Sequence, residues 1–424
     1  MRSRISPTVI VSVIVTVLIV AGAATLAMFA QLATRFHPSI NGNNLYRSHV
    51  TANPDGTFTV GASFAATQSQ PVPQGEKRFV FVSSSERTST TTAATDDDYI
   101  IGKTDRNGDW VGGFTTRTGG FYSNPAATTG TGNIAVSVSG LKPSLSLYTP
   151  QGQKLWTQPV TVPFNTDRIQ QGCTTVSVAA SFENSVIATY YCPEVSASFV
   201  AGITSDGRTR WSRTILTPAS PVLNLPLLST TSDGTVYMVA STGTGMSTLS
   251  KIDYLSGGDL NPVPMLSPHP YTVTGFVMSP DGQSAVIAGM PFRSANSATP
   301  EWVWGNTKIT DSFLLKTSSK EFAPWWIKVD KKFSQSVFSV GADGSVAAIT
   351  YNGEKQNFAP SDTEGETFNS FTGKEELSRN PLTTVHALDA ATVLIPPGET
   401  AQQNSLLFTS GEGTGRLFLT RQNM

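Results

Sequence analysis

One short phrase recurs through the middle of this chain: an apolar strand, a tight turn and a second apolar strand. It reads LSTTSDGTVYMVAS around Asp233-Gly234, FVMSPDGQSAVIAG around Asp281-Gly282 and FSVGADGSVAAITY around Asp343-Gly344. Asp-Gly between alternating apolar runs is a strong hairpin signal, because both residues tolerate the positive φ of a type I′ turn. One such unit cannot bury its apolar face alone, so the copies must stack against one another.

The copies follow one another at a steady distance along the chain. From Asn133 through the Glu183-Asn184 turn to Gly234 and Gly282 the step is roughly 50 residues, the period of a propeller blade or a solenoid unit. A second phrase lies between the hairpins, in LYTPQGQKLWTQPV (147–160) and ITSDGRTRWSRTIL (203–216). Each unit therefore contains about four short strands, as a blade does.

The composition agrees with a strand-rich fold. Only 14% of the residues are charged, and the richness in Ser, Thr, Gly and Val favours strands and turns. Dividing about 370 residues by the repeat period gives seven or eight units, of which we favour seven. We therefore expect an all-β fold, a β-propeller of about seven (seven or eight) four-stranded blades over residues 51–424, preceded by one N-terminal transmembrane helix.

The N-terminal segment differs from the rest because residues 5–34 carry no charge. A membrane span needs roughly 20 apolar residues, whereas the apolar region of a signal peptide has about 7–15. The length predicts a cytoplasmic tail at 1–7, a transmembrane helix at 8–32 and a stem at 33–50. The short basic tail favours a cytoplasmic N-terminus with the large domain on the other side. A cleaved signal peptide is the alternative, since small residues near Ala30 suit a peptidase.

Two small residues in this segment, Ala23 and Ala27, have the small-x-x-x-small spacing that lets a second membrane helix approach closely. They are our candidates for transmembrane packing. The ordinary composition of a membrane span is the alternative explanation of the pair.

The two cysteines, Cys173 and Cys192, flank two alternating apolar runs. Their midpoint falls between Phe182 and Glu183, in the expected turn, so an antiparallel hairpin places the cysteines opposite each other. Facing Cβ atoms lie about 4.5–5.5 Å apart, which predicts a disulfide and an oxidising compartment. Two buried free thiols in a cytosolic protein are the alternative, and the expected anchor argues against it.

The glycine-to-tryptophan spacing resembles that of the PQQ-type (quinoprotein-like) β-propellers, in which a Trp after a turn glycine docks between neighbouring blades. Three pairs carry this motif, the third at a shorter spacing: Gly152 with Trp156, Gly207 with Trp211, and Gly108 with Trp110. The resemblance implies the same fold and a blade-docking role for Trp110, Trp156 and Trp211. Quinoprotein dehydrogenases that bind the cofactor carry a vicinal Cys pair, which this chain lacks, so we expect no cofactor. A shared fold does not transfer an activity.

Four of the seven Trp residues gather in two short stretches, EWVWGNTKITDSF and APWWIKV. Alternation places Trp302 and Trp304 on the same face of a strand. Exposed aromatic side chains form protein contacts or stack on sugar rings, so Trp302, Trp304, Trp325 and Trp326 form a candidate interaction surface. The alternative is a blade that packs its own core with these rings.

Nothing in the sequence indicates catalysis or a metal site. The four His residues are scattered and have no partner at metal-ligand spacing: His37, His49, His269 and His386. Elbow, P-loop and dinucleotide motifs are absent. We therefore assign no catalytic, cofactor-binding or metal-binding residue. A net charge of −1 and a pI near 6.4 argue against nucleic acid as a partner.

These observations predict a single-pass protein of the bacterial cell membrane with an extracytoplasmic propeller. We expect a non-catalytic scaffold or accessory subunit in the cell envelope, with envelope or membrane proteins as partners, because a propeller presents loops on a rigid disc. The first alternative is a module that binds cell-wall glycan or glycolipid. The second is an enzyme, either quinone-dependent or glycan-cleaving.

Overall fold

Strands make up almost all of the regular structure. Within 45–423 the computed structural model describes the chain except for residues 65–97, 106–109, 120, 166–171, 182–184, 216–224, 242–246, 266–270, 292–301, 305–306, 322–323, 332, 334–336, 342–343, 350–353, 359–370, 373–384, 393–404 and 413–415. Besides strands, this part of the chain contains a short 3-10 helix, η1 (Pro193–Val195). The all-β prediction is confirmed.

Five sheets of the described chain have four strands each. The first two comprise β1 (Leu45–Ala52), β2 (Phe58–Phe64), β3 (Asp98–Thr104) and β4 (Trp110–Arg117), and then β6 (Ala126–Thr128), β7 (Ile134–Val138), β8 (Ser144–Tyr148) and β9 (Lys154–Pro159). The third comprises β14 (Leu227–Thr230), β15 (Val236–Ser241), β16 (Ser247–Ile252) and β17 (Asp259–Met265). The last two comprise β18 (Tyr271–Met278), β19 (Ser284–Pro291), β22 (Phe313–Ser318) and β23 (Pro324–Val329), and then β24 (Val337–Val340), β25 (Val346–Ile349), β26 (Glu354–Phe358) and β27 (Phe371–Thr372).

The remaining sheets depart from this pattern. One has five strands: β10 (Thr174–Ala180), β11 (Val186–Cys192), β12 (Ala197–Ile203), β13 (Thr209–Ile215) and β5 (Phe121–Asn124). Another has three, β28 (Val385–Thr392), β29 (Ser405–Glu412) and β30 (Arg416–Asn423), and a separate hairpin pairs β20 (Trp302–Trp304) with β21 (Thr307–Ile309). The prediction of seven or eight four-stranded blades is wrong for the described chain, which has five of them. An inserted strand enlarges one sheet, and the last sheet has three strands.

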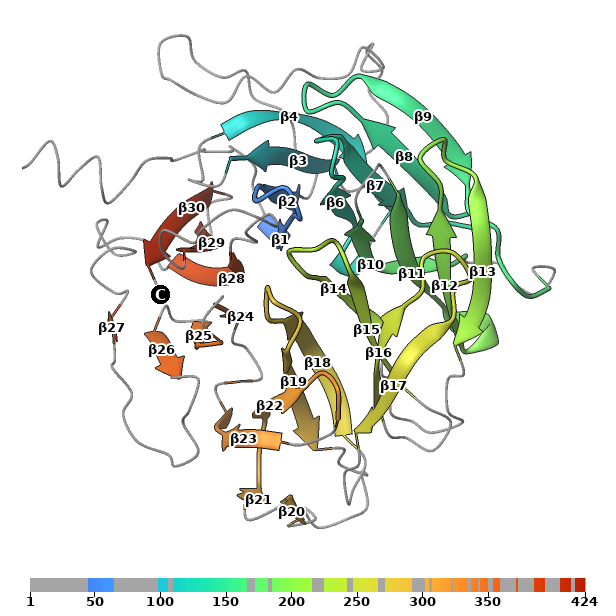
Figure 1. Cartoon of the computed structure of the whole chain (residues 1–424). Coiled ribbons are helices and arrows are strands. Elements are labelled where there is room, and N and C mark those ends of the chain that lie inside the picture. The colour runs from blue at the N-terminus through green and yellow to red at the C-terminus, as the bar shows by residue number, and fades with distance from the viewer. Residues whose placement is uncertain are drawn as a thin grey trace, which may run out of the picture.

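The sheets form a closed ring (Figure 1). One strand of each sheet contacts one strand of the next, in the order β1, β6, β10, β14, β18, β24 and β28, and β28 contacts β1 again. Within the sheets, consecutive strands pair antiparallel, as in β14–β15 and β15–β16. A ring of small antiparallel sheets around a common centre is a β-propeller, as the sequence repeat predicts.

The Asp-Gly turns differ in type from the prediction. At the β14–β15 turn the N–H of Gly234 donates to the carbonyl of Thr231 (2.9 Å), and the N–H of Thr231 donates to that of Thr235 (3.0 Å). Gly234 has a φ of 75°, whereas Asp233 is not among the residues with positive φ. This is a three-residue loop, a type I turn followed by a left-handed glycine. The predicted type I′ turn is wrong because one residue more than expected joins the strands.

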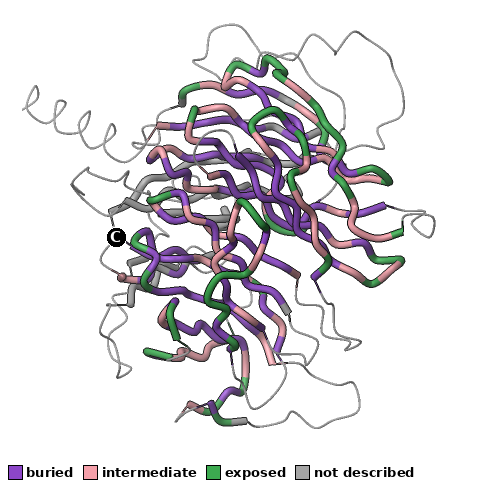
Figure 2. The backbone as a smooth tube through the Cα atoms, turned by 45° about the vertical axis from the view of Figure 1, so that its right-hand side comes forward, coloured by how far each residue is buried: buried purple, intermediate pink, exposed green. Residues whose placement is uncertain are grey.

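Buried apolar side chains fill the spaces between neighbouring sheets. In one cluster Ile187 and Val200 of the β10–β13 sheet pack with Val236 and Met238 of the β14–β17 sheet. Figure 2 shows buried residues along the strands and exposed ones mainly at turns and outer edges. Each sheet hides its faces against its neighbours, so the ring is the stable unit rather than any single sheet.

β5 is an insertion beside β10, at the end of its sheet opposite β13. It pairs with β10 in parallel and also contacts β1. Asn124 holds it in place: its Nδ2 donates to the carbonyl of Val178 (2.7 Å), and its Oδ1 accepts from the hydroxyl of Ser177 (2.6 Å). The inserted strand thereby covers the edge of β10 that would otherwise stay unpaired.

The predicted tail and transmembrane helix, with Ala23 and Ala27, lie outside the described residues. β1 begins at Leu45, within the range expected for the stem. No helix among the described residues is long and apolar enough to cross a membrane.

Candidate functional site

Trp156 connects its own sheet to the next one. It lies on β9, and its Nε1 donates to the carbonyl of Ser205 in the β12–β13 turn (3.0 Å). A Cβ atom at Gly207 of that turn would lie 2.8 Å from Cε3 of the indole. Only glycine leaves the ring this space, and Gly207 also has a positive φ of 88°.

Trp211 makes the equivalent contact one sheet further on. It lies on β13, and its Nε1 donates to the carbonyl of Tyr254 in the β16–β17 turn (2.6 Å). A Cβ atom at Gly257 would lie 2.5 Å from Cδ2 of the indole. Arg213 adds a second link, since its Nε donates to the carbonyl of Gly257 (2.6 Å) and its Nη2 lies 2.5 Å from Oδ1 of Asp259.

Trp110 does not occupy the equivalent position on β4. Trp156 is paired with Leu147 on the neighbouring strand, and the corresponding pair in the first sheet is Lys103 with Gly112. Trp110 lies two residues earlier, opposite Thr104. The side chain of Trp110 lies outside the described residues, so its docking role stays a prediction.

Trp326 occupies a docking position that the sequence did not reveal. It pairs with Lys316 in the same register as Trp156 with Leu147. Its side chain is 5% exposed and belongs to a buried cluster shared by the β18–β23 sheet and the β24–β27 sheet, where it lies with Phe338. Trp326 is therefore a core residue rather than part of an interaction surface.

The other members of the predicted aromatic surface divide between core and solvent. Trp304 is 5% exposed, with its ring 5.5 Å from that of Tyr271 and 5.7 Å from that of Phe313. The prediction that Trp304 is exposed is wrong, because the β20–β21 hairpin folds its ring into the core. Trp325 is 41% exposed on the outermost strand of its sheet. The side chain of Trp302 lies outside the described residues.

The predicted disulfide is confirmed. Cys173 and Cys192 are bonded, with Cα atoms 4.2 Å apart, and both side chains are buried. The register places Thr174 opposite Tyr191 immediately beside them, as a hairpin centred on the predicted turn requires. The bond joins the two ends of the β10–β11 hairpin.

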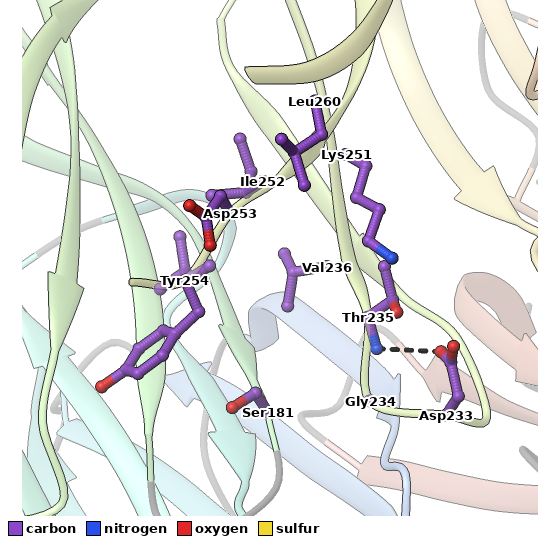
Figure 3. A pocket seen from close by; sticks show the side chains of 11 residues that line it. Ser181, Asp233, Gly234, Thr235, Val236, Lys251, Ile252, Asp253, Tyr254 and Leu260 are labelled. Carbon is purple, nitrogen blue, oxygen red and sulfur yellow. Dashed lines mark hydrogen bonds between the residues drawn. The ribbon is translucent and has the colours of Figure 1, made fainter. Parts of the chain in front are cut away.

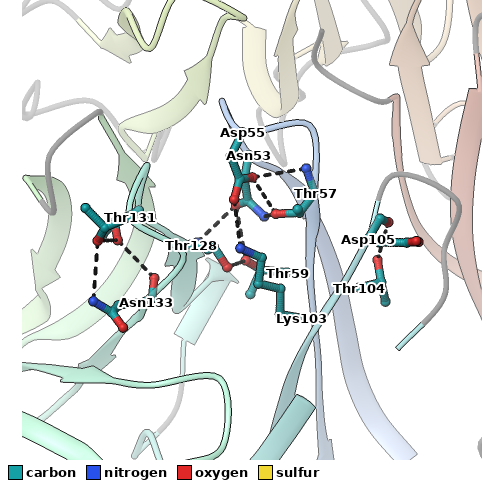
Figure 4. A network of polar contacts seen from close by, with 11 residues as sticks. Asn53, Asp55, Thr57, Thr59, Lys103, Thr104, Asp105, Thr128, Thr131 and Asn133 are labelled. Atoms are coloured by element: carbon teal, nitrogen blue, oxygen red, sulfur yellow. Dashed lines mark hydrogen bonds and ion pairs between the residues drawn. The ribbon is translucent and has the colours of Figure 1, made fainter. Parts of the chain in front are cut away.

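A partly buried ion pair lies at the turn of the first sheet. Nζ of Lys103 is 2.7 Å from Oδ2 of Asp55, and the two side chains are 8% and 22% exposed (Figure 4). Oδ1 of Asp55 accepts from the backbone N–H of Thr57 (3.0 Å). Next to it, Oδ1 of Asn53 accepts from the backbone N–H of Thr128 in the next sheet (3.0 Å). The charges are neutralised, so this turn has a structural role.

A cavity of about 260 Å³ opens at the turn end of the β14–β17 sheet, next to Ser181 and Ile187 of the β10–β11 hairpin. In Figure 3 Lys251 and Leu260 lie along one side, Asp253 and Tyr254 along the other, and Val236 between them. The lining residues are Ser181, Ile187, Asp233, Gly234, Thr235, Val236, Lys251, Ile252, Asp253, Tyr254 and Leu260.

Two carboxylates beside the cavity are ionised at neutral pH. Burial acts to raise the pKa of Asp233, but hydrogen bonds from Thr231 and Thr235 and the charge of Lys251 outweigh it, so its pKa is lowered. The hydroxyl of Ser256 and the backbone N–H of Leu255 lower the pKa of Asp253. The cavity therefore has two negatively charged acceptor groups, Asp233 and Asp253, and one positively charged donor group, Lys251.

The chemistry of the cavity suits recognition of a small polar group. Its volume lies just below the roughly 300–1,000 Å³ of most small-molecule sites, and apolar side chains such as Ile187 and Val236 form part of its wall. No group of three or more His, Cys, Asp or Glu within the described ranges is arranged to hold a metal ion. His49 is buried between Tyr99 and Phe121 and does not face the cavity.

The sequence patterns above did not identify Lys251 as a site residue, although a recurring lysine marks its position. Lys103, Lys251 and Lys316 each interrupt an apolar strand just before a turn, in IIGKTD, LSKIDY and LLKTSS. A charged residue at a half-buried strand position needs a partner. This repeated lysine is therefore a marker of polar chemistry at the turns.

No family model matches the sequence, and no curated protein matches it. Several solved structures are similar to the chain. The Dos1 propeller is 10% identical with a TM-score of 0.48, covering 91% of this chain and 94% of that one. The C-terminal WD40 domain of Sif2 is 8% identical with a TM-score of 0.41, covering 91% and 97%. BamB from Moraxella catarrhalis is 12% identical with a TM-score of 0.38, covering 76% and 88%.

Proposed function

We propose that this chain is a non-catalytic interaction scaffold: a β-propeller of the bacterial cell envelope, anchored by residues 8–32, that docks envelope or membrane proteins. A closed ring of packed sheets is rigid, and a rigid disc presents its rim and loops to a partner without an ordering cost. The observation that carries the proposal is the exposed indole of Trp325.

The Trp325 side chain is exposed at the rim and its orientation is fixed by a neighbouring residue. It lies on β23, the outermost strand of its sheet, and is 41% exposed, whereas the next residue, Trp326, is buried. Nζ of Lys316 lies 4.9 Å from the centre of the Trp325 ring, which fixes the ring by a cation–π contact. Tryptophan is one of the three residue types most enriched at the hot spots of protein interfaces.

The location outside the cytoplasm is supported by the disulfide between Cys173 and Cys192. Such bonds persist in oxidising compartments and are rare in the cytosol. The length of the apolar segment at 8–32 supports a single membrane span rather than a short signal region.

Membership of the PQQ-like propellers is supported by two contacts. Trp156 and Trp211 each place the indole on the turn glycine of the next sheet and donate to a carbonyl of the same turn. The motif fixes neighbouring blades and brings no cofactor chemistry with it.

The scaffold is tested by purifying the full-length chain from its native host in mild detergent after light cross-linking, followed by mass spectrometry. We expect the native chain to recover a partner in stoichiometric amount. Val111→Ala is the control and should recover the same amount, because Val111 is a 49% exposed apolar residue on the outermost strand of another sheet. Trp325→Ala should lower the affinity for the partner roughly thirtyfold, because it removes a hot-spot side chain that contributes about 2 kcal/mol to binding.

Two outcomes would contradict this. A chain that comes out without any stoichiometric partner excludes the scaffold role. A partner recovered equally with Trp325→Ala and Val111→Ala excludes the Trp325 contact.

A further inference from the structure

The Lys103–Asp55 ion pair of the first sheet corresponds to two residues at the cavity, Lys251 and Asp233. Lys103 pairs with Thr59, and Lys251 pairs with Tyr237, each partner lying three residues after the turn glycine. Asp55 and Asp233 precede those glycines in turns of the same hydrogen-bonding pattern. The two lysines and the two aspartates therefore occupy equivalent places in the two sheets.

The two pairs nevertheless differ. Lys103 is 2.7 Å from Asp55, whereas within the described chain Lys251 makes no ion pair with Asp233, although its charge still lowers the pKa of that carboxyl. The Lys251 ammonium in Figure 3 points along the strand toward Thr235.

The residue opposite each lysine explains the difference. In the first sheet Thr59 is small, and Nζ of Lys103 reaches the next sheet, 3.1 Å from where a Cβ atom of Gly132 would lie. In the β14–β17 sheet the corresponding residue is Tyr237, whose hydroxyl lies 3.5 Å from the equivalent place at Gly282. The tyrosine occupies the space between the sheets that the lysine would need.

Because Lys251 and Asp233 are not paired with each other in the described structure, both keep hydrogen-bonding capacity at the cavity. Oδ1 of Asp233 accepts from the hydroxyl of Thr231 (2.5 Å) and from the backbone N–H of Thr235 (3.0 Å), and the Thr235 hydroxyl also acts on this carboxylate. A carboxylate has about four acceptor sites, so capacity is left for a ligand, and the ammonium of Lys251 offers up to three donors. Val236 and Leu260 add apolar wall beside these groups.

We propose that this cavity binds one neutral sugar unit. Hydroxyl groups both donate and accept, so one ring can accept from Lys251 and donate to the carboxylate of Asp233. A purely anionic group would meet the carboxylates of Asp233 and Asp253, and a purely cationic group would meet Lys251. The volume of about 260 Å³ admits one ring, whose C–H face packs on the apolar wall.

This site does not depend on the scaffold role, because Lys251 lies on β16 and Trp325 on β23. The test is calorimetric titration of the full-length chain, in a detergent without a sugar head group, with glucose, galactose, mannose and N-acetylglucosamine. We expect saturable one-site binding of at least one of them at millimolar affinity.

Variants assign the binding to the cavity. Lys251→Met keeps the length of the side chain and removes the charge, and Asp233→Asn keeps an acceptor oxygen for the turn. Each should weaken binding at least tenfold, because a hydrogen bond to a charged group contributes about 1.5–3 kcal/mol. Asp281→Asn is the matched control, since Asp281 accepts the same kind of turn hydrogen bonds, from Ser279 and Gln283, but does not line the cavity.

Three results would overturn the proposal. The first is that none of the four sugars shows saturable binding. The second is that Asp281→Asn weakens binding as much as Asp233→Asn, which would mean a general effect on the turns. The third is that acetate binds more tightly than every sugar, which would make the cavity a carboxylate site instead.

Discussion

At the scale of single residues, the contacts between sheets depend on glycines that receive an indole ring. Gly257 has a φ of 74°, and a Cβ atom there would lie 2.5 Å from the ring of Trp211. The next residue, Gly258, has no such restriction: its Cβ atom would meet the hydroxyl of Ser256 at 3.2 Å and nothing else within 4 Å. Two adjacent glycines thus have different roles.

Gly257→Ala should destabilise the protein by roughly 2 kcal/mol or more. The left-handed backbone alone costs about 1–2 kcal/mol for an L-residue, and the indole must also move. Gly258→Ala is the control and should change the unfolding free energy by less than about 1 kcal/mol. Denaturant unfolding of the full-length chain measures both, and equal midpoints for the two variants would contradict the docking contact.

At the scale of elements, the β10–β11 hairpin combines local pairing with a covalent link. Its strands pair from Thr174 opposite Tyr191 to Ala180 opposite Val186, with a register shift between Thr175 and Ser177. The disulfide closes the open end of this hairpin, next to η1. It restricts the unfolded chain more than it adds contacts to the folded one.

Replacing both cysteines, Cys173→Ala with Cys192→Ala, should lower the unfolding free energy by about 3 kcal/mol, the loop-entropy effect for a closed loop of this length. Reductant should lower the thermal midpoint of the native chain toward that of the double variant and leave the double variant unchanged. A native midpoint that does not respond to reductant under unfolding conditions would show that the bond contributes no stability.

At the scale of the whole molecule, the stability of the ring depends on pH through a buried histidine. His49 on β1 is 1% exposed, stacks on Tyr99 with ring centres 5.7 Å apart, and meets the edge of Phe121 on β5. Its Nδ1 lies 2.5 Å from the Tyr99 hydroxyl. Burial lowers the pKa of His49 from 6.5 to about 3. The folded ring therefore keeps this side chain neutral at pH values where the unfolded chain protonates it.

The free energy of unfolding should fall as the pH drops below about 6.5, by about 1.4 kcal/mol per unit, because the unfolded state binds a proton that the folded state does not. The loss continues until the pH approaches the folded-state pKa of about 3. His49→Gln should remove this part of the slope. Tyr99→Phe should retain it, because the histidine stays buried. Denaturant unfolding at about pH 7 and about pH 4.5 checks this, and identical slopes for the native chain and His49→Gln would refute it.

The sequence by itself determined the features that depend on local order along the chain. Hairpin periodicity and turn glycines predicted an all-β ring of repeated units, and the spacing of Cys173 and Cys192 predicted their bond. Both follow from pairing between neighbouring strands, where the period of two and the turn position fix which residues face each other.

Only the tertiary structure decided what each repeated residue does, because that depends on the neighbouring sheet. Trp325 and Trp326 are identical residues side by side, yet one is exposed and the other buried between sheets. Lys103 and Lys251 hold equivalent positions, and a threonine or a tyrosine opposite them decides whether the lysine closes an ion pair or borders a cavity. Contacts between sheets join side chains far apart in sequence, and repetition along the chain carries no information about their fit.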